Sequence, residues 1–275
     1  AKRAIPLYEA LYRLNPTDEA LTQRMVDLYR EVGNLADALE LLNELQNISD
    51  AARPGIEMQK AYLLWELKRF EEAALILTKL SREFPESDKL RYLSGLGQER
   101  LGNYMAAVKT YESLPADTSY WKSAQFRAAV SYRELKQTDD AIRVAERLIE
   151  SEKADWDAYL LLGSLYADKE QFDDAIAITK AGYTKFPDRH RLLFMQGVHQ
   201  EKSGDIEDCI ATMRQVIEKD PTNSSAYNYL GYLFAERGEN LDEAERLILK
   251  ALELKPGDGF YLDSLGWVYY QKGEL

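Results

Sequence analysis

Small and apolar residues recur along this chain with a period of 34 or 35 residues. One series of small residues runs through the whole length: Ala4, Ala38, Ala73, Ala107, Ala141, Ala175, Cys209 and Ala244. A second series precedes the first by twelve or thirteen residues and continues once more near the end: Val26, Ala61, Gly95, Ala129, Gly163, Gly197, Gly231 and Gly266. A period held this tightly predicts a stack of similar supersecondary units.

Each repeat is predicted to be a pair of antiparallel helices. A small residue on each helix lets the two backbones approach to about 8 Å, the close end of helix packing distances. A third series lies midway between the first two and would end the first helices in a left-handed conformation: Gly33, Gly102, Gly204, Gly238 and Gly273. A proline cannot continue a helix, and prolines follow the expected second helices: Pro16, Pro85, Pro187, Pro221 and Pro256.

The pattern resembles the tetratricopeptide repeat family over the whole chain. The residues that carry the resemblance are clearest in one repeat: Tyr227, Leu230, Gly231, Phe234, Ala244, Ile248, Ala251 and Pro256. The resemblance implies an all-α, right-handed superhelical solenoid of antiparallel helix pairs that binds other proteins. The fourth repeat departs from the pattern with Ala129 and Lys153, and the third pair ends early at Pro115, so we expect local changes in curvature there.

We expect a single solenoid domain over residues 1–275. Its parts would be a half-unit at 1–17, full repeats at 18–52, 53–86, 87–121, 122–155, 156–189, 190–223 and 224–258, and a half-unit at 259–275. Apolar residues such as Tyr8 and Leu265 would then lack a stacking neighbour at the two ends. The sequence is therefore expected to be a fragment of a longer protein, with weak self-association through its open ends.

The composition disfavours several classes of function. A net charge of −12, from 47 acidic and 35 basic residues, opposes binding to nucleic acid or to an anionic membrane surface. No apolar run reaches the roughly 18 residues of a membrane-spanning helix. The single cysteine, Cys209, is expected to pack in the core.

The sequence also predicts no catalytic, cofactor or metal site, and we expect the chain not to be an enzyme. His190 and His199 are nine residues apart, so they would face different sides of one helix and could not form a metal pair. No nucleophile elbow or phosphate-binding loop is present. Acidic pairs such as Asp173 and Asp174 lie where a second helix should begin, and negative charge is favourable there.

The resemblance places the first helix of each repeat on a concave wall. Positions 5, 9 and 12 of the repeat form one stripe on that helix, which we call the groove stripe. It is predicted to bind protein and contains Met58, Tyr62, Trp65, Tyr92, Leu96, Phe126, Val130, Arg133, Leu160, Phe194, Val198, Tyr232, Trp267 and Tyr270. In the alternative interpretation, some of these aromatic residues only wedge between adjacent first helices.

The predicted function is a protein-binding scaffold or adaptor that holds an apolar or amphipathic segment of a partner. Positions 5 and 9 contain no Lys or Arg, which disfavours a clamp for a C-terminal carboxylate. The last repeats are similar to bacterial tetratricopeptide proteins, many of them lipoproteins or adaptors that face the periplasm. An envelope location is expected on that basis, with the cytoplasm as the alternative. Two further functions stay open: an assembly protein that stacks through its ends, and a regulatory arm of an enzyme encoded in the flanking sequence.

Overall fold

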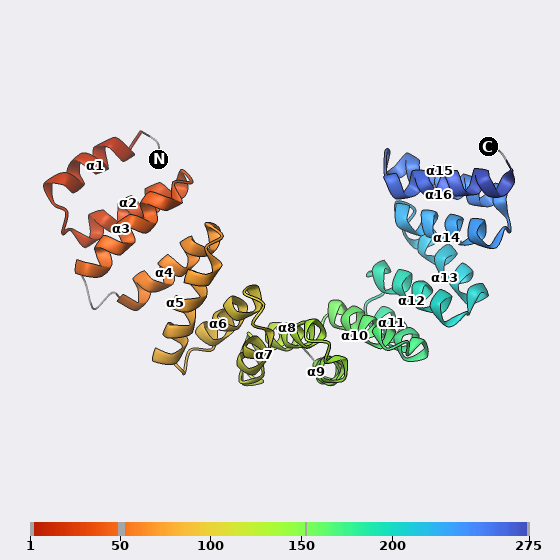
Figure 1. Ribbon diagram of the computed structural model, residues 1–275, viewed down its shortest axis with the longest axis horizontal. Helices are drawn as coiled ribbons and strands as arrows, with labels where there is room; N and C mark the ends of the chain where they lie inside the picture. The colour runs from red at the N-terminus through yellow and green to blue at the C-terminus, as the bar shows by residue number, and fades with distance from the viewer. Residues whose placement is uncertain (1–2, 49–52, 152, 274–275) are drawn as a thin grey trace. The chain divides into compact units, whose positions relative to one another are not determined.

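The computed structural model describes residues 3–48, 53–151 and 153–273. The end of the first full repeat, predicted at residue 52, lies outside these ranges. The described residues form sixteen α-helices in sequential antiparallel pairs (Figure 1). They are α1 (Ile5–Leu14), α2 (Glu19–Glu31), α3 (Leu35–Ile48), α4 (Arg53–Glu66), α5 (Phe70–Glu83), α6 (Asp88–Arg100), α7 (Tyr104–Glu112), α8 (Trp121–Glu134), α9 (Thr138–Glu150), α10 (Trp156–Asp168), α11 (Phe172–Lys185), α12 (His190–Ser203), α13 (Ile206–Lys219), α14 (Ser224–Arg237), α15 (Leu241–Leu254) and α16 (Gly259–Lys272).

The helices form two compact units. Residues 1–137, with α1 to α8, make the N-terminal unit, and residues 138–275, with α9 to α16, make the C-terminal unit. Within each unit a helix packs mainly on the helices next to it in sequence, such as α4 on α5, α5 on α6 and α14 on α15. The predicted all-α architecture of helix pairs is confirmed, and the single solenoid domain stays a prediction.

Close contact between the two helices of a repeat explains the small residues. Members of the first series from Ala38 to Ala244 are completely buried, including Cys209, whose thiol pKa burial raises to about 12. A Cβ atom added to Gly231 in α14 would lie 2.9 Å from the carbonyl oxygen of Ala244 in α15. A Cβ added to Gly266 in α16 would meet nothing within 4 Å. A glycine is therefore required at position 231, where α15 packs on α14.

The turn inside each helix pair keeps one backbone conformation. The predicted terminator glycines all have positive φ, between 65° and 92°. The same step of the period is occupied by Lys68, Lys136 and Glu170, and these also have positive φ, between 59° and 61°. Tertiary packing thus imposes the left-handed residue on the repeats that lack glycine.

Four of the five prolines predicted to follow second helices have a helix-capping side chain two residues later in the sequence. The side chains of Asp18, Ser87, Asn223 and Asp258 accept hydrogen bonds from backbone N–H groups in the first turns of α2, α6, α14 and α16. Each cap follows a proline by two residues, so one short segment ends a second helix and begins the next first helix. This spacing fixes the start of α6, one of the helices that line the candidate site.

A comparison of two glycines tests the packing within the helix pair. We expect Gly231→Leu to lower the free energy of unfolding by about 1–3 kcal/mol or more, because the side chain would enter the space occupied by α15. Gly266→Leu should cause no loss and a gain of up to about 1 kcal/mol, since Leu is the better helix former and the space is open. Urea unfolding followed by circular dichroism measures both. Equal destabilisation of the two variants would contradict the assignment.

One histidine is buried without a hydrogen-bond partner in the described residues. His199 of α12 is 2% exposed, and neither of its ring nitrogens has a partner. Its Nε2 lies 3.5 Å from where a Cβ on Gly163 of α10 would stand. Burial, with a smaller effect from Lys202, lowers the pKa of His199 to about 4. The folded C-terminal unit therefore holds this imidazole neutral.

The neutral histidine predicts a loss of stability in acid. Between about pH 6.5 and 4 the unfolded chain binds a proton that folded His199 does not, so stability falls as the pH falls. The full effect is up to about 3 kcal/mol. Its place in the repeat is occupied by Leu63, Leu165 and Leu233 elsewhere, so His199→Leu should fold and remove this part of the pH dependence. Thermal unfolding from pH 4 to 7 measures it, with His190→Gln as control. An unchanged pH profile in His199→Leu would refute the prediction.

Candidate functional site

The groove stripe lies at the surface of the helices, beside the core. None of its fourteen residues is fully buried, and Tyr62, Tyr232, Trp267 and Tyr270 are between 38% and 57% exposed. The other ten are half-buried. Neighbouring positions are in the core, for example Ala61, Leu63 and Leu64 beside Tyr62. The stripe stays a prediction as a binding surface, and its side chains have the exposure that binding requires.

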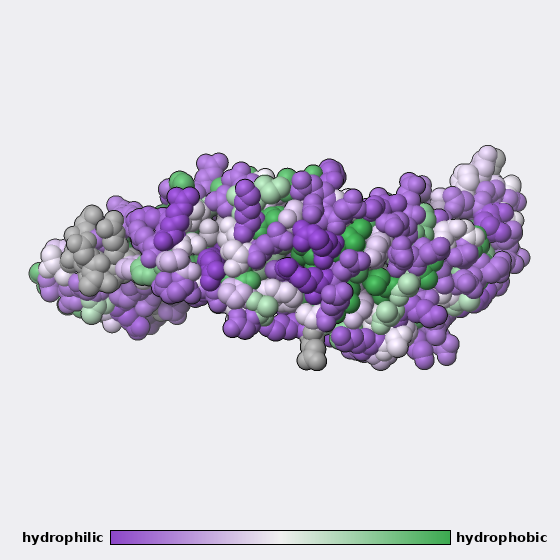
Figure 2. All heavy atoms as spheres, turned by 90° about the horizontal axis from the view of Figure 1, so that it is seen from below, coloured by the Kyte–Doolittle hydropathy of each residue, from purple (hydrophilic) through white to green (hydrophobic). Residues whose placement is uncertain are grey.

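One face of the molecule shows how hydrophobic residues are distributed on the surface (Figure 2). Hydrophilic residues cover most of the face seen in Figure 2, and hydrophobic residues gather in smaller areas among them. Scattered apolar residues are normal on a protein surface, whereas grouped ones mark candidate interaction sites.

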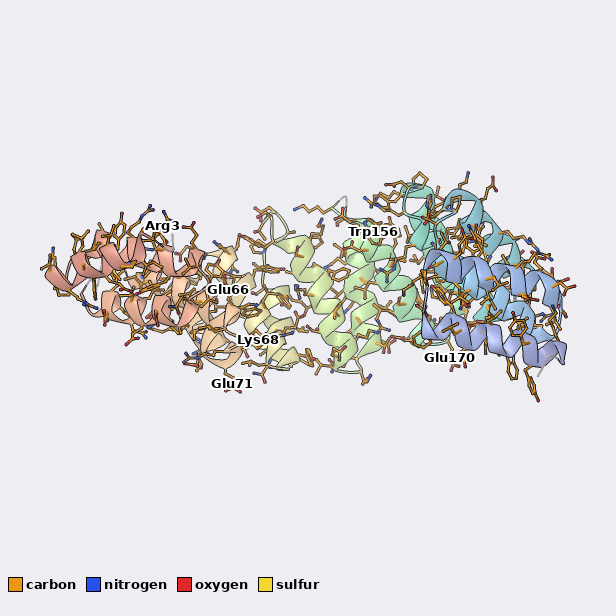
Figure 3. The ribbon with its side chains drawn as sticks, turned by 90° about the horizontal axis from the view of Figure 1, so that it is seen from above. Arg3, Glu66, Lys68, Glu71, Trp156 and Glu170 are labelled. Atoms are coloured by element: carbon orange, nitrogen blue, oxygen red, sulfur yellow. The ribbon has the colours of Figure 1, made fainter. Side chains whose placement is uncertain are left out.

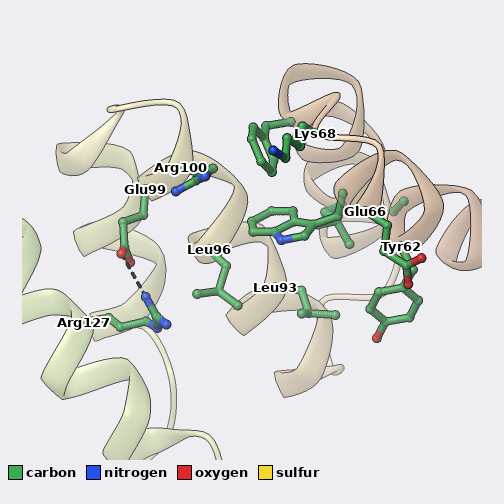
Figure 4. A pocket seen from close by; sticks show the side chains of 12 residues that line it. Tyr62, Glu66, Lys68, Leu93, Leu96, Glu99, Arg100 and Arg127 are labelled. Carbon is green, nitrogen blue, oxygen red and sulfur yellow. Dashed lines mark hydrogen bonds and ion pairs between the residues drawn. The ribbon is translucent and has the colours of Figure 1, made fainter.

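Three residues of the stripe share one pocket of about 660 Å³ in the N-terminal unit. Tyr62 and Trp65 come from α4, and Leu96 comes from α6 (Figure 4). We call this the α4–α6 pocket, and the other residues that line it are Ala61, Glu66, Lys68, Phe70, Leu77, Leu93, Glu99, Arg100 and Arg127. Met58, Tyr92, Phe126, Val130 and Arg133 belong to the same unit but do not line the pocket.

Aromatic contacts order the floor of the α4–α6 pocket. Trp65 packs edge-on against Phe70, with ring centroids 5.4 Å apart. The Arg100 guanidinium lies over the Phe70 ring at 4.4 Å from its centroid. The ammonium of Lys89 lies 5.9 Å from the centroid of Tyr62. Cations above aromatic faces are attracted by the ring quadrupole, so these contacts fix both rings and charges before any ligand binds.

A hydrogen-bonded network forms one wall of the pocket. The hydroxyl of Tyr111 donates to Glu99 Oε2 at 2.7 Å, and an Arg127 nitrogen lies 2.9 Å from Glu99 Oε1. Arg127 Nε also donates to the hydroxyl of Tyr92 at 3.2 Å. Burial and the neighbouring Glu99 raise the pKa of Tyr111 above its usual range, so its hydroxyl remains a donor. The carboxylate of Glu99 is therefore neutralised within the fold.

Tyr92 is held by this wall instead of facing the pocket. Its ring stacks on Tyr120 with centroids 5.3 Å apart, and it lies 6.0 Å from the ring of Tyr111. Its hydroxyl accepts the hydrogen bond from Arg127. For this residue the wedge interpretation explains the aromatic side chain better than direct recognition does.

Three charged residues border the pocket without an ion-pair partner in the described structure. Lys68 follows the end of α4, and Glu66 is the last residue of that helix (Figures 3 and 4). Glu66, Lys68 and Arg100 are exposed. In the part of the chain that the structure describes, none of the three has an ion-pair partner. They are therefore available to charged groups of a ligand.

Three pocket cations and one ring lie outside the groove stripe: Lys68, Arg100, Arg127 and Phe70. Arg127 and Arg100 are each one residue beyond a stripe position, and Phe70 belongs to the first turn of a second helix. Adjacent residues of a helix differ by about 100° in direction, so both sides of the stripe can border the same groove. A wider stripe would have included the two arginines, but the sequence holds no signal that places Phe70 beside Trp65.

In the C-terminal unit, the remaining stripe residues are spread over α10, α12, α14 and α16. Phe194 packs edge-on with Tyr229 at 5.6 Å, and Trp267 stacks on Tyr270 at 5.2 Å. Phe194 also lines a second pocket of about 470 Å³ with Trp156, Asp188, Arg189, His190, Arg191, Asp220, Asn223 and Ser225. Leu160, Val198 and Tyr232 line neither pocket.

The α4–α6 pocket has the chemistry of a binding site. Its lining contains apolar, aromatic, carboxylate, ammonium and guanidinium groups, but no histidine, cysteine or serine. Across residues 3–48, 53–151 and 153–273, no group of three or more His, Cys, Asp or Glu side chains is placed to hold a metal ion. Within the same ranges, no helix has both the length and the apolar content to cross a membrane.

Comparisons with known proteins support the repeat architecture. A tetratricopeptide repeat model matches residues 103–275, and a second model of that name matches residues 58–123. Tetratricopeptide repeats generally bind protein segments and are typically non-catalytic. The solved C-terminal part of a TPR repeat-containing protein from Cytophaga hutchinsonii aligns with a TM-score of 0.69 at 15% identity, over 88% of this chain and 98% of that one. YrrB, described as a TPR protein with an unusual peptide-binding site, aligns with a TM-score of 0.51 at 18% identity, over 68% and 96%.

Two curated proteins are similar in sequence. The TPR repeat-containing protein PA4667 of Pseudomonas aeruginosa is 34% identical over 152 residues, which are 52% of this chain and 26% of that protein. The DnaJ homolog subfamily C member 7 homolog of Dictyostelium discoideum is 24% identical over 255 residues, 91% of this chain and 43% of that protein. The chain thus spans about a quarter of the first relative and less than half of the second. Because a family model covers more than half of its residues, the chain belongs to the tetratricopeptide repeat family.

Proposed function

We propose that this chain is a non-catalytic scaffold that holds an apolar or amphipathic segment of a partner protein against its first helices. The observation that carries the proposal is the α4–α6 pocket, where Tyr62, Trp65 and Leu96 line a 660 Å³ space. Pockets of this size lined by aromatic side chains and a few charges are typical of ligand sites. Tyr and Trp are also enriched among the residues that dominate binding energy.

The family and one structural relative support this proposal. Tetratricopeptide repeats generally bind protein segments. YrrB, which shares the fold, is described as having a peptide-binding site. A partner segment in this chain would contact the half-buried apolar side chains of successive first helices, beginning at the α4–α6 pocket.

A bacterial envelope location, facing the periplasm, is part of the proposal, together with an adaptor role of the kind found among bacterial tetratricopeptide lipoproteins. The similarity to a Pseudomonas aeruginosa protein supports a bacterial context. Cell fractionation of the full-length gene product tests the location. Recovery with the cytoplasmic fraction would favour the alternative.

Peptide selection tests the groove directly. We expect phage-displayed 12-residue peptides selected on the immobilised chain to be apolar or amphipathic. Binding of the selected peptides should weaken by about thirtyfold in Tyr62→Ala and Trp65→Ala, the loss expected when about 2 kcal/mol is removed from a hot spot. Lys109→Ala, an exposed change on α7, is the control and should bind like the parent chain. Fluorescence anisotropy measures the affinities, and circular dichroism verifies folding.

Two results would count against the proposal. Peptides that bind folded Tyr62→Ala and Trp65→Ala as tightly as the parent chain would place recognition on another surface. Loss of helical signal in these variants would show that the two residues belong to the core.

Self-association is a second candidate, favoured by the exposed apolar residues of α1 and α16. Leu7 and Leu14 of α1 are 69% and 83% exposed, and Phe260 of α16 is 84% exposed. In addition, the space beside Gly266, which a second helix fills at Gly231, is open. Sedimentation velocity over a hundredfold concentration range tests this candidate. A concentration-independent monomer, or association that persists in Leu14→Glu and Phe260→Glu, would exclude these faces.

A further inference from the structure

We propose that the α4–α6 pocket selects a segment in which an apolar side chain is flanked by carboxylates. This inference rests on the proposed function, because it names the chemistry of the segment that the groove holds. It follows from the charge around the pocket, from the groups that remain unpaired there, and from the aromatic floor.

The chain's negative charge is concentrated away from the pocket. Residues 1–137 contain 19 Lys and Arg against 20 Asp and Glu, whereas residues 138–275 contain 16 against 27. From residue 53 to residue 137, basic residues are in excess, 14 to 11. The pocket therefore lies in the basic part of a chain whose overall charge is −12. Only the local charge acts strongly on a bound group, since charges beyond about 10 Å are screened at ordinary ionic strength.

Of the charged groups that line the pocket, Glu99 and Arg127 pair with each other, while Glu66, Lys68 and Arg100 remain unpaired among the described residues. Glu99 is occupied by Arg127 and Tyr111. Lys68 and Arg100 have no carboxylate partner among the described residues, and Lys89 adds a third cation beside Tyr62. Glu66 is the one lining carboxylate that remains without a cation in the described structure. The open charges of the mouth are therefore mainly positive.

Arg100 is oriented for recognition before a ligand arrives. Its guanidinium lies 4.4 Å from the centroid of Phe70, so one face of the group rests on the ring. A stacked guanidinium keeps its N–H edge free for a carboxylate, which it can bind through two parallel hydrogen bonds. In the view of Figure 4, Lys68 and Arg100 lie along the same edge of the pocket. A carboxylate there would lie beside an apolar side chain seated over Trp65.

The position of the cations distinguishes this site from a clamp for a chain terminus. In the other first helices, no Lys or Arg occupies the stripe positions equivalent to Met58 and Tyr62. Lys68 and Arg100 lie past these positions, at or beyond the ends of α4 and α6. We therefore expect recognition of internal Asp or Glu side chains, without need for a free C-terminus.

Four fluorescein-labelled peptides with amidated C-termini test the inference. The acidic probe is Gly-Asp-Asp-Phe-Leu-Asp-Gly, and the basic and neutral probes replace each Asp by Lys or Asn. The fourth probe keeps the Asp residues and replaces Phe-Leu by Ala-Ala. At low salt the acidic probe should bind at least about tenfold more tightly than the basic probe, and the advantage should shrink as salt screens the charges. The Ala-Ala probe should bind more weakly than the acidic probe, because it cannot fill the apolar floor.

Matched variants separate charge from folding. Lys68→Gly and Arg100→Gln should each reduce the preference for the acidic probe and leave the neutral probe unchanged. Lys136→Gly is the control for the first, since Lys136 shares the left-handed conformation but does not line the pocket. Arg82→Gln on α5 is the control for the second, because Arg82 is an exposed arginine outside the pocket. Glu66→Gln should strengthen binding of the acidic probe.

The outcomes are distinguishable from failure of the proposed function. If the neutral and basic probes bind as tightly as the acidic one, and Tyr62→Ala weakens all three, the groove binds segments and the acidic preference is wrong. If Lys136→Gly and Arg82→Gln reduce the preference as much as the pocket variants, the selectivity comes from overall charge and the inference fails. If no probe binds up to millimolar concentration, the inference fails at this pocket, while the peptide selection described above decides the broader function.

Discussion

The close approach of two helix backbones within each repeat governs the packing of this protein. At Gly231 the carbonyl oxygen of Ala244 occupies the place of a side chain, and at Gly163 the methyl group of Thr179 does so, 2.9 Å from an added Cβ. Bulky residues of the first helix are therefore excluded from this line of contact. They lie on its flanks, either in the core or on the half-exposed stripe that contains Tyr62 and Trp65. Packing inside the hairpin thus determines which side chains remain available for a partner.

The fold could be predicted from the sequence because each structural requirement leaves its own periodic residue. Small residues mark the helix contact, and prolines mark the ends of second helices. The left-handed turn could be predicted only where a glycine marks it. Lys68, Lys136 and Glu170 adopt the same conformation without a glycine. A non-glycine residue in this region costs roughly 1–2 kcal/mol, so neighbouring helices must hold the turn at these three places. The backbone conformation of this turn therefore repeats along the chain more regularly than the residue type at the same position.

The candidate site could be predicted less well, for a physical reason. Helical spacing places Tyr62, Trp65 and Leu96 on one side of their helices, and in the structure all three line one pocket. It does not determine which neighbours meet between repeats. Tyr92 accepts a hydrogen bond from Arg127 of the next repeat, and the ring of Phe70, on a second helix, lies under Arg100 of the next repeat. Such contacts depend on how one hairpin is seated on the next, which no single repeat encodes.

The net charge of a repeat protein does not indicate the charge of each part of its surface when the repeats differ in composition. The acidic pairs at the starts of second helices, such as Asp173 with Asp174, interact with helix N-termini. They contribute to the total of −12 without defining the surface of the first helices. Around the α4–α6 pocket, the Glu99 carboxylate is already neutralised while Arg100 rests on an aromatic ring with its edge free. A chain that is acidic as a whole can therefore present a basic, aromatic site to its partner, because the charge that a ligand meets is the charge left unpaired within a few ångströms.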